Sequence, residues 1–569
     1  DLGLEVQGIA VEDRFREAHI LPAEIAAGGA ERGVIDRDAN HQRQGKGAVD
    51  DAGAELGVFA VFLVKMQACR VVGEAGKDEV VGLGHGAADR VLELLPNLKF
   101  FVIQSGHGVS PLVMIIMMFV FSFCGADARP ASSIRMTCVA CGQNMVRRHE
   151  TGVEGMTQEG DLLWQPDEQR IEQARMTRFM RWLARERDLD FADYETLRQW
   201  SVEHIEDFWA AYWDYLQISS SAPYDQVLSD RQMPGARWFT GSRLNYAEHA
   251  LRHVRDDEPA LWFASEQQAL SSLSGAEFKA QVAAMAHALR GFGIGPGDRV
   301  VAYLPNIPQT VVACLATLSL GAVWSSCAPD FGASTVLDRF QQIEPKLIFV
   351  VDGYRYGGKD FDRCDEVRHI VDSLPTLEQV VVVRYLDAAS ELPVADVVDW
   401  DALVDVDDVP DLKFEQVAFE HPLWIVYSSG TTGLPKAIVH GHGGVLLELH
   451  KMLDLHCNLG PGDRMFFYSS SGWIMWNILT ASLLVGAAPV LYDGNPAGPA
   501  NDGQVDVLWR LASESKATLF GASPTYLAMM QKEGVVPKNE YDMSAMRGVL
   551  LSGSPVTPES MQWLYDNVK

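Results

Sequence analysis

The chain has 569 residues, of which 47% are hydrophobic and 22% are charged, and its formal net charge is −29 at pH 7. An apolar fraction of this size can form sizeable cores, so the composition excludes a disordered or fibrous chain. The surplus of acids repels phosphate backbones and anionic lipid headgroups, and we therefore expect neither nucleic acid nor a membrane as a partner. A nucleotide is compatible with this charge, because a few local amides and cations suffice to hold its phosphates.

The cysteines and one apolar run indicate the cellular compartment of the protein. The eight cysteines are too scattered for a disulfide framework, and the pair Cys138 and Cys141 has no second pair at zinc-site spacing. The apolar run at 112–123 is well short of the roughly 20 residues that span a bilayer. These features predict a cytoplasmic protein with no bound metal and no transmembrane helix.

Residues 1–155 differ in pattern from the rest of the chain. They show no sustained helical or strand period with recognisable caps and turns. After Met156 the pattern changes, and residues 171–187 alternate apolar and charged positions at helical spacing. We interpret Met156 as the true start and residues 1–155 as an unassigned stretch of translated upstream sequence. A poorly patterned extra domain is the alternative.

Residues 156–250 are expected to form a mainly helical N-terminal segment. Within it, Ser201 is followed by Glu203 and Glu206, which fit the opening turns of a helix because the helix dipole favours negative charge there. We therefore predict that Ser201 is the N-cap of a helix that continues through Trp209 and Trp213.

Residues 251–569 alternate between short apolar runs and helical runs. Two Gly-Pro-Gly-Asp-Arg turns, at 295–299 and 460–464, each precede a short apolar run that reads as a strand. After the first strand, a helical run at 309–320 ends at Gly321 in the C-cap position. Strand, helix and strand in this order form the unit of a parallel sheet. We expect an α/β fold of layered parallel sheets, with further strands at 345–351, 379–383, 488–491 and 517–520.

The chemistry is concentrated in a glycine-rich loop between two apolar strands, 423–427 and 437–440. Its glycines lack Cβ atoms and let backbone amides approach phosphate oxygens, while hydroxyls and one ammonium group supply donors and charge. The loop is not a Walker motif, because a proline precedes the lysine and a strand follows it. A solvated turn is the alternative. The predicted phosphate-binding residues are Ser428, Ser429, Gly430, Thr431, Thr432, Gly433 and Lys436.

Residues 427–436 resemble the phosphate-loop signature of the adenylate-forming superfamily, which includes the acyl-CoA synthetases. The segment 238–249 is similar to one shared by acetyl-CoA and acetoacetyl-CoA synthetases, and the resemblance starts near Trp164. Residues 469–477 resemble the aromatic segment that borders the acyl pocket, in the form found in acetoacetyl-CoA synthetases. The resemblance therefore implies acyl-pocket roles for Trp473, Trp476 and Asn477, although both tryptophans could instead be core aromatics.

Two further motifs take their roles from the same resemblance. Residues 551–556 lie where the family places a backbone turn against adenine, which assigns that role to Gly553, Ser554 and Pro555, with a plain turn as the alternative. Residues 354–359 resemble the segment that meets the CoA nucleotide, which assigns CoA binding to Gly357, Gly358 and Lys359. Tyr356 stands where the family carries an arginine. His440 and His442 have no ligand partners at metal-site spacing, and we interpret them as structural.

The resemblance implies ATP-dependent ligation of acetoacetate to CoA through an acyl adenylate, with ATP, Mg²⁺ and CoA as substrates and no tightly bound cofactor. In the family the magnesium-binding acid, the catalytic lysine and the small C-terminal domain follow at positions beyond Lys569. We therefore expect an incomplete large domain, without the small C-terminal domain, that does not turn over by itself. A short-chain acyl-CoA synthetase such as an acetyl-CoA synthetase and a non-catalytic nucleotide-binding remnant are the alternatives. The sequence predicts no oligomeric state.

Overall fold

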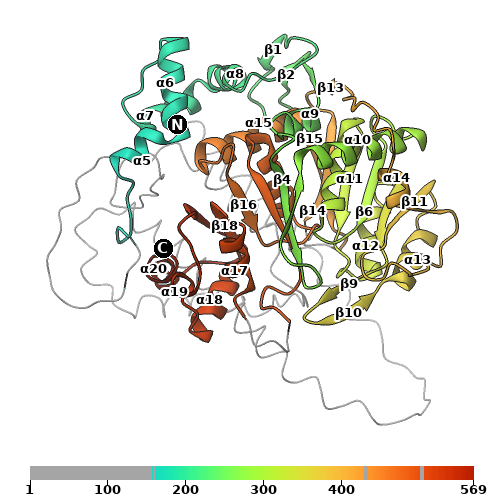
Figure 1. Ribbon diagram of the computed structural model, residues 1–569. Coiled ribbons are helices and arrows are strands. Elements are labelled where there is room, and N and C mark those ends of the chain that lie inside the picture. The colour runs from blue at the N-terminus through green and yellow to red at the C-terminus, as the bar shows by residue number, and fades with distance from the viewer. Residues whose placement is uncertain (1–156, 158–159, 429–432, 500–504) are drawn as a thin grey trace, which may run out of the picture. The chain divides into compact units, whose positions relative to one another are not determined.

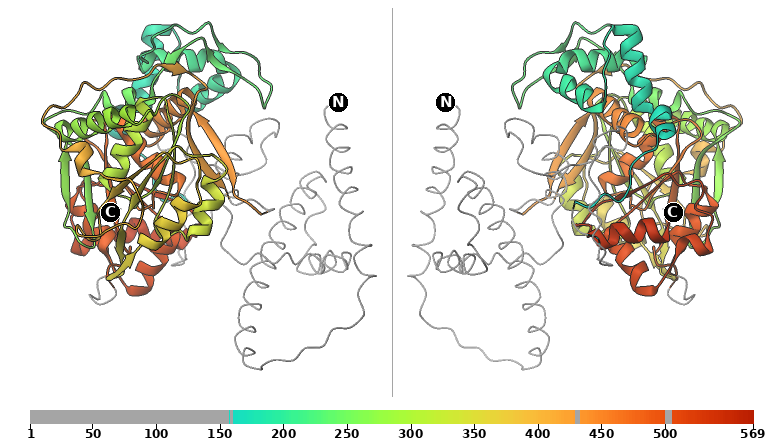
Figure 2. Two further views of the ribbon diagram at one scale, coloured as in Figure 1. Left: turned by 90° about the vertical axis from the view of Figure 1, so that its right-hand side faces the viewer. Right: turned by 90° about the vertical axis from the view of Figure 1, so that its left-hand side faces the viewer.

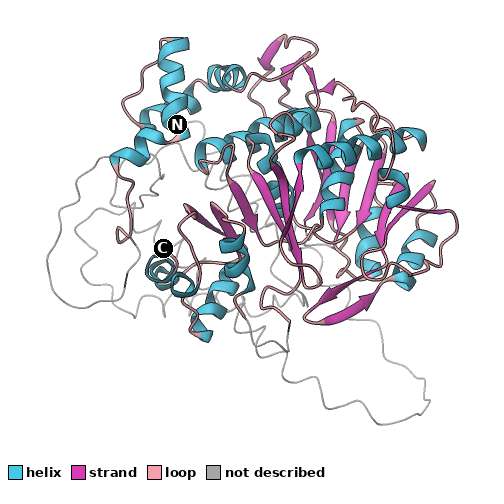
Figure 3. Ribbon diagram, in the orientation of Figure 1, coloured by secondary structure: helices cyan, strands magenta, loops and turns pink. Residues whose placement is uncertain are grey.

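The computed structural model describes residues 157, 160–428, 433–499 and 505–569. The interpretations of residues 1–155 and of Met156 concern positions outside this range. Four predicted phosphate-loop residues also lie outside the described residues: Ser429, Gly430, Thr431 and Thr432. Figure 3 shows the strands of the described part running between layers of helices, so the predicted α/β fold is confirmed. No helix of the described part is long and apolar enough to cross a bilayer.

The chain enters the described part through four helices, drawn in turquoise to green in Figures 1 and 2. They are α5 (Glu168–Gln173), α6 (Arg175–Arg187), α7 (Tyr194–Glu203) and α8 (Ile205–Tyr215). The prediction that Ser201 caps a helix is wrong. Asp193 and Thr196 form a capping box that starts the helix earlier, with 2.8 Å between the Thr196 amide and the Asp193 carboxylate. Ser201 therefore lies within α7, where its hydroxyl donates to the Arg198 carbonyl at 2.7 Å.

The larger sheet has seven strands in the order β12-β11-β8-β6-β7-β14-β15, and every neighbouring pair is parallel except β14 with β15. The predicted strands that follow Arg299 and Pro345 are present as β6 and β8. The strands are β6 (Arg299–Tyr303), β7 (Val323–Cys327), β8 (Leu347–Val351), β11 (Gln379–Val383), β12 (Val397–Asp399), β14 (Pro422–Ser428) and β15 (Lys436–Gly441).

Both faces of this sheet are buried, because side chains of successive strand residues point to opposite sides. On one face Val301, Ile348 and Val350 pack into a core that includes residues of α12 (Ala333–Phe340) and α13 (Cys364–Asp372). On the other face the alternate residues join the largest core of the molecule. Helices α10 (Gly275–Gly291), α11 (Pro308–Ser319) and α15 (His442–Lys451) contribute to that core.

The second sheet has six strands in the order β19-β18-β16-β17-β4-β5, parallel except for the edge strand β5. One of its faces packs on α17 (Val507–Glu514) and α18 (Pro524–Glu533), and the other joins the largest core. The strands are β4 (Pro259–Ser265), β5 (Ser271–Ser274), β16 (Arg464–Phe467), β17 (Ala488–Asp493), β18 (Leu519–Ala522) and β19 (Gly548–Leu551).

Short elements complete the described part. The helices are α9 (Tyr246–Leu251), α14 (Asp401–Val404), α16 (Ile474–Thr480), α19 (Pro537–Glu540) and α20 (Pro558–Asn567), with a π-helical turn η3 (Met452–His456) and a 3₁₀ turn η4 (Ala481–Val485). The hairpins and bridging pairs are β9 (Gly353–Tyr356) with β10 (Lys359–Asp362), β1 (Gln226–Leu228) with β2 (Trp238–Thr240), and β3 (Arg243–Leu244) with β13 (Val417–Ala418). Figure 1 shows α20 beside α18 and α19 near the C-terminus.

Candidate functional site

The carboxyl ends of the two sheets meet at residues 469–472, the segment that follows β16. The Asn306 amide, after β6, donates to the Ser469 carbonyl at 3.2 Å and to the Tyr492 carbonyl of β17 at 3.4 Å. Ser326, near the end of β7, donates to the Ser471 carbonyl at 2.7 Å. Ligands of open α/β sheets bind outside the carboxyl ends of the strands, and this junction is therefore the candidate site.

The phosphate loop leaves the sheet at this junction. Ser428 is the last residue of β14 and is buried, and it pairs with exposed Lys436 at the start of β15. Gly433 is exposed and has φ +121°, a backbone conformation that a side chain would strain. Two strands therefore fix both ends of the loop while its lysine faces solvent, as a phosphate-binding loop requires.

The two histidines after the loop are held by hydrogen bonds within the fold. His440 accepts a hydrogen bond from the Trp424 indole at 3.0 Å, and His442 accepts one from the Tyr246 amide at 3.2 Å. Burial lowers the pKa of His442 to about 3, so its imidazole is neutral and can accept that hydrogen bond. Within the ranges that the structure describes, no group of three or more His, Cys, Asp or Glu side chains could hold a metal ion.

The three residues assigned to the acyl pocket occupy different environments. Trp473 is 44% exposed, whereas Trp476 is fully buried and donates its indole N–H to the Asn306 amide oxygen at 3.0 Å. Asn477 is buried and lines a small cavity together with Ser471. The remaining lining residues are Trp324, Ser326, Ile425, Val426, Tyr427 and Gly472. The structure thus joins the acyl segment to the strand that leads into the phosphate loop.

The hairpin assigned to CoA has its glycine amides occupied. Gly357 and Gly358 form the turn between β9 and β10, at φ +62° and +76°, and each amide donates to the Glu266 carboxylate at 2.7 Å. The Asn495 amide donates to the same carboxylate at 2.7 Å. Lys359 is exposed. Sequence reasoning missed Glu266, whose only signal is its position directly after β4, at the carboxyl edge of the second sheet.

The turn assigned to adenine follows β19, at the edge of the second sheet. Gly553 has φ +107°, and Gly553, Ser554 and Pro555 are all exposed. The Ser552 amide donates to the Ala522 carbonyl at 3.3 Å, which fixes the turn beside the end of β18. The turn therefore lies at the carboxyl edge of the second sheet and presents its backbone to solvent.

An acidic residue that sequence reasoning also missed connects the two sheets. The Tyr385 hydroxyl, after β11, donates to the carboxylate of Asp493 at the end of β17, at 3.0 Å. Burial, helped by the nearby carboxylates of Glu266 and Asp330, raises the pKa of Asp493 to about 7, although the hydrogen bond from Tyr385 lowers it. This carboxyl therefore changes its charge near neutral pH.

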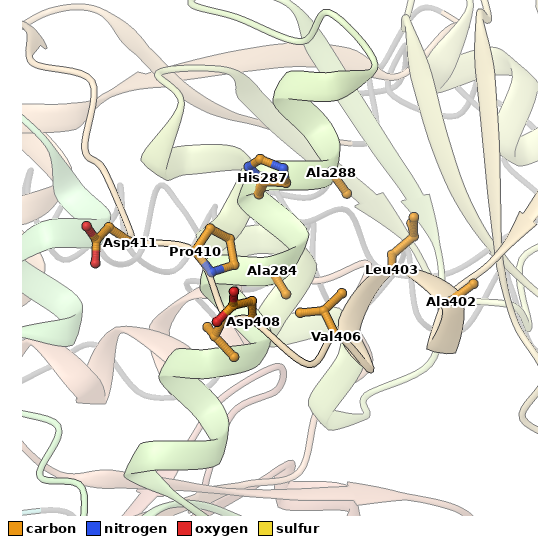
Figure 4. Close-up of a pocket in the computed structure, with 10 residues that line it drawn as sticks. Ala284, His287, Ala288, Ala402, Leu403, Val406, Asp408, Pro410 and Asp411 are labelled. Atoms are coloured by element: carbon orange, nitrogen blue, oxygen red, sulfur yellow. The ribbon is translucent and has the colours of Figure 1, made fainter.

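A larger cavity lies away from this junction. It has a volume of about 640 Å³ and lies between α10 and residues 402–411. Figure 4 shows side chains that line this cavity, among them Ala284 and His287 of α10 and Val406, Asp408 and Asp411 of the segment after α14. None of the predicted site residues lines it, so we assign it no part in the chemistry.

Comparison with known proteins identifies the family. A family model described as "AMP-binding enzyme" matches residues 247–569, and a model of the "Acetyl-coenzyme A synthetase N-terminus" matches residues 194–250. The chain belongs to the AMP-binding enzyme family, which confirms the resemblance to adenylate-forming enzymes.

Several relatives that resemble this chain are acyl-CoA synthetases. The acetoacetyl-CoA synthetase of Danio rerio is 41% identical over 421 residues, covering 72% of this chain and 62% of that protein. The solved structure of acetoacetyl-CoA synthetase from Streptomyces lividans is 51% identical, has a TM-score of 0.68, and is matched over 71% of this chain and 62% of its own. The malonamoyl-CoA synthetase of Penicillium aethiopicum is 32% identical over 429 residues, covering 71% of this chain and 59% of that protein. The chain thus spans less than two thirds of the length of these relatives.

Proposed function

We propose that this chain supplies the nucleotide-binding and acyl-binding part of an enzyme that joins acetoacetate to CoA at the expense of ATP. The observation that carries the proposal is the cavity that Tyr427, just before the phosphate loop, shares with Asn477 of the acyl segment. A carboxylate beside the phosphate loop would there have its acyl chain next to Asn477. That arrangement is what attack of a carboxylate on a nucleotide phosphate requires.

The proposed reaction has two steps. A carboxylate oxygen of acetoacetate attacks the α-phosphorus of ATP, and the bond to pyrophosphate breaks. The thiol sulfur of CoA then attacks the acyl carbon, AMP leaves and the thiol releases its proton. Mg²⁺ enters as the ATP complex and supplies charge to the phosphates.

The site residues keep the roles expected from the sequence, as proposals. Ser428 to Gly433 with Lys436 would hold the phosphates, and Gly553 to Pro555 would lie against adenine. Trp473, Trp476 and Asn477 would border the acyl group, and Gly357, Gly358 and Lys359 the CoA nucleotide. The four cysteines of the described residues, Cys314, Cys327, Cys364 and Cys457, are free thiols, which supports a reducing, cytoplasmic compartment.

A second candidate function is the ligation of another short acid. The malonamoyl-CoA synthetase among the relatives shows that this architecture is compatible with a different acyl group. Acetoacetate is favoured because several relatives with that name match at higher identity, and because the cavity contains polar side chains that could recognise a ketone.

Nucleotide binding to this chain tests the first half of the proposal. Isothermal calorimetry should detect MgATP, and Lys436→Ala should weaken binding by roughly tenfold or more, because the ammonium group forms charge-assisted contacts. Lys532→Ala, on the exposed side of α18, is the matched control and should bind as the unsubstituted chain does. Equal affinities of the two variants would count against the phosphate-loop assignment.

Pyrophosphate exchange tests the second half. The protein read beyond Lys569 should exchange labelled pyrophosphate into ATP with acetoacetate, and less efficiently with acetate or butyrate. An extended protein that used acetate as well as acetoacetate would favour a general short-chain acyl-CoA synthetase.

A further inference from the structure

The proposed function needs a hydrogen-bond donor for the ketone oxygen of acetoacetate, and three tryptophans lie near the acyl segment. The N–H of Trp476 is already bonded to Asn306, and Trp473 is 44% exposed. Trp324, on β7, remains. It is 1% exposed, and its indole N–H has no hydrogen-bond partner among the residues that the structure describes.

Trp324 is held rigidly at the cavity. Its ring lies 6.5 Å from that of Trp476 at an interplanar angle of 25°, and 6.4 Å from that of Phe349. Ser326 projects from the same face of β7, and both residues line the cavity with Asn477. A donor held by packing on two sides is preorganised for a ligand, because little side-chain freedom is lost on binding.

The cavity suits a small polar group. Its volume of about 10 Å³ is close to that needed for one water-sized group. Tyr427 lines the cavity on the side of the phosphate loop, so an acid whose carboxylate approaches that loop has its chain directed toward Trp324. The oxygen of a 3-oxo acid would satisfy the unpaired N–H, whereas the methylene of a saturated acid would leave it unpaired.

An unpaired indole N–H is not sufficient by itself. Trp509 also has a buried N–H without a partner in the described ranges, yet it belongs to the core on the far face of the second sheet and lines neither cavity. Trp324 differs because its ring borders the cavity shared by the phosphate-loop strand and the acyl segment. That difference makes Trp509 a matched control.

We propose that Trp324 is a specificity-determining residue of the acyl site, whose indole N–H donates a hydrogen bond to the 3-oxo oxygen of a short 3-oxo acid. This inference rests on the proposed function and goes beyond it, because it assigns discrimination between acetoacetate and butyrate to one N–H group on β7.

Binding to this chain tests the proposal independently of turnover. The indole nitrogens of the tryptophans are labelled with the nitrogen isotope used in NMR spectroscopy. The indole N–H resonance of Trp324 is identified by its loss from the spectrum of Trp324→Phe. Acetoacetate in the presence of MgATP should shift that resonance, whereas butyrate at the same concentration should shift it much less. A shift of equal size with both acids, or no shift with either acid, would overturn the proposal.

Exchange kinetics in the protein extended beyond Lys569 give the second readout. Trp324→Phe keeps an aromatic ring but removes the donor, so kcat/KM for acetoacetate should fall roughly ten- to hundredfold while that for butyrate changes little. Trp509→Phe should leave the ratio of the two unchanged. Equal losses for both acids in Trp324→Phe would indicate a structural role only. Absence of acetoacetate-dependent exchange in the unsubstituted protein would refute the proposed function, while the resonance shift would still decide whether Trp324 binds the 3-oxo group.

Discussion

The carboxylate of Glu266 accepts the amide N–H of Gly357 at 2.7 Å, and thereby fixes the turn of the β9–β10 hairpin to the end of β4. The same carboxylate accepts the amides of Gly358 and Asn495. A carboxylate in this position occupies the donors that a phosphate would otherwise use. The proposed contact of this hairpin with CoA would therefore depend on exposed Lys359 rather than on the glycine amides.

Replacing Glu266 should loosen the hairpin. Glu266→Ala leaves three backbone amides without their acceptor, so we expect hydrogen exchange at Gly357 and Gly358 to accelerate and the free energy of unfolding to fall by roughly 1–3 kcal/mol. Hydrogen exchange read by mass spectrometry measures the first effect. Gln267→Ala, at the exposed neighbouring position, is the control. Unchanged exchange in the hairpin of Glu266→Ala would contradict the role assigned to this carboxylate.

A buried ion pair attaches the N-terminal helices to the rest of the described part. Arg175 of α6 contacts the carboxylate of Asp454, which is fully buried in the π-helical turn η3. Burial raises the pKa of Asp454, while Arg175 lowers it. Arg175→Ala would leave this buried charge unpaired, so we expect a loss of about 3–5 kcal/mol in the free energy of unfolding.

An exposed ion pair provides the comparison. Arg198 of α7 pairs with Glu195, but the two side chains are 45% and 64% exposed. Arg198→Ala should therefore cost less than about 1 kcal/mol. Denaturant unfolding of both variants measures the difference, and equal losses would show that Asp454 is solvated or protonated when its partner is removed.

Local patterns predicted the fold well because they depend on neighbouring residues. Helix α11 ends just before Gly321 as expected, with Gly321 at φ +68°. The site was predicted less completely, because contacts between distant residues leave no local signal. Glu266 and Gly357 are 91 positions apart. Exposed Trp473 and buried Trp476 likewise could not be distinguished from the sequence, because the environment of Trp476 depends on distant Asn306, in the loop after β6.

Removing residues 1–155 should leave the stability of the remainder unchanged. The family models match from residue 194 onward, and the sequence before Met156 lacks a matched period and caps. A chain starting at Met156 should therefore melt at the same temperature as the whole chain. A chain starting at Tyr194 should melt lower, because it also removes the buried Phe179 and Leu183 of α6. A clearly lower melting temperature for the Met156 chain would show that residues 1–155 stabilise the fold.

Asp493 should make stability depend on pH between about 4 and 7. Its pKa rises from an ordinary 3.8 to about 7 in the folded protein, so in this interval the folded state binds a proton that the unfolded state does not. The stability that this group contributes is then fully present below pH 4. As the pH rises through 7 it is lost, by up to about 4 kcal/mol.

Asp493→Asn keeps an oxygen that can accept the hydrogen bond from the Tyr385 hydroxyl, but the amide cannot ionise. Its unfolding free energy should match that of the unsubstituted chain near pH 4 and exceed it at pH 8, as measured by denaturant unfolding at both pH values. Asp365→Asn, at an 83% exposed side chain, should follow the unsubstituted chain throughout. A parallel pH dependence in Asp493→Asn would mean that another group controls the transition.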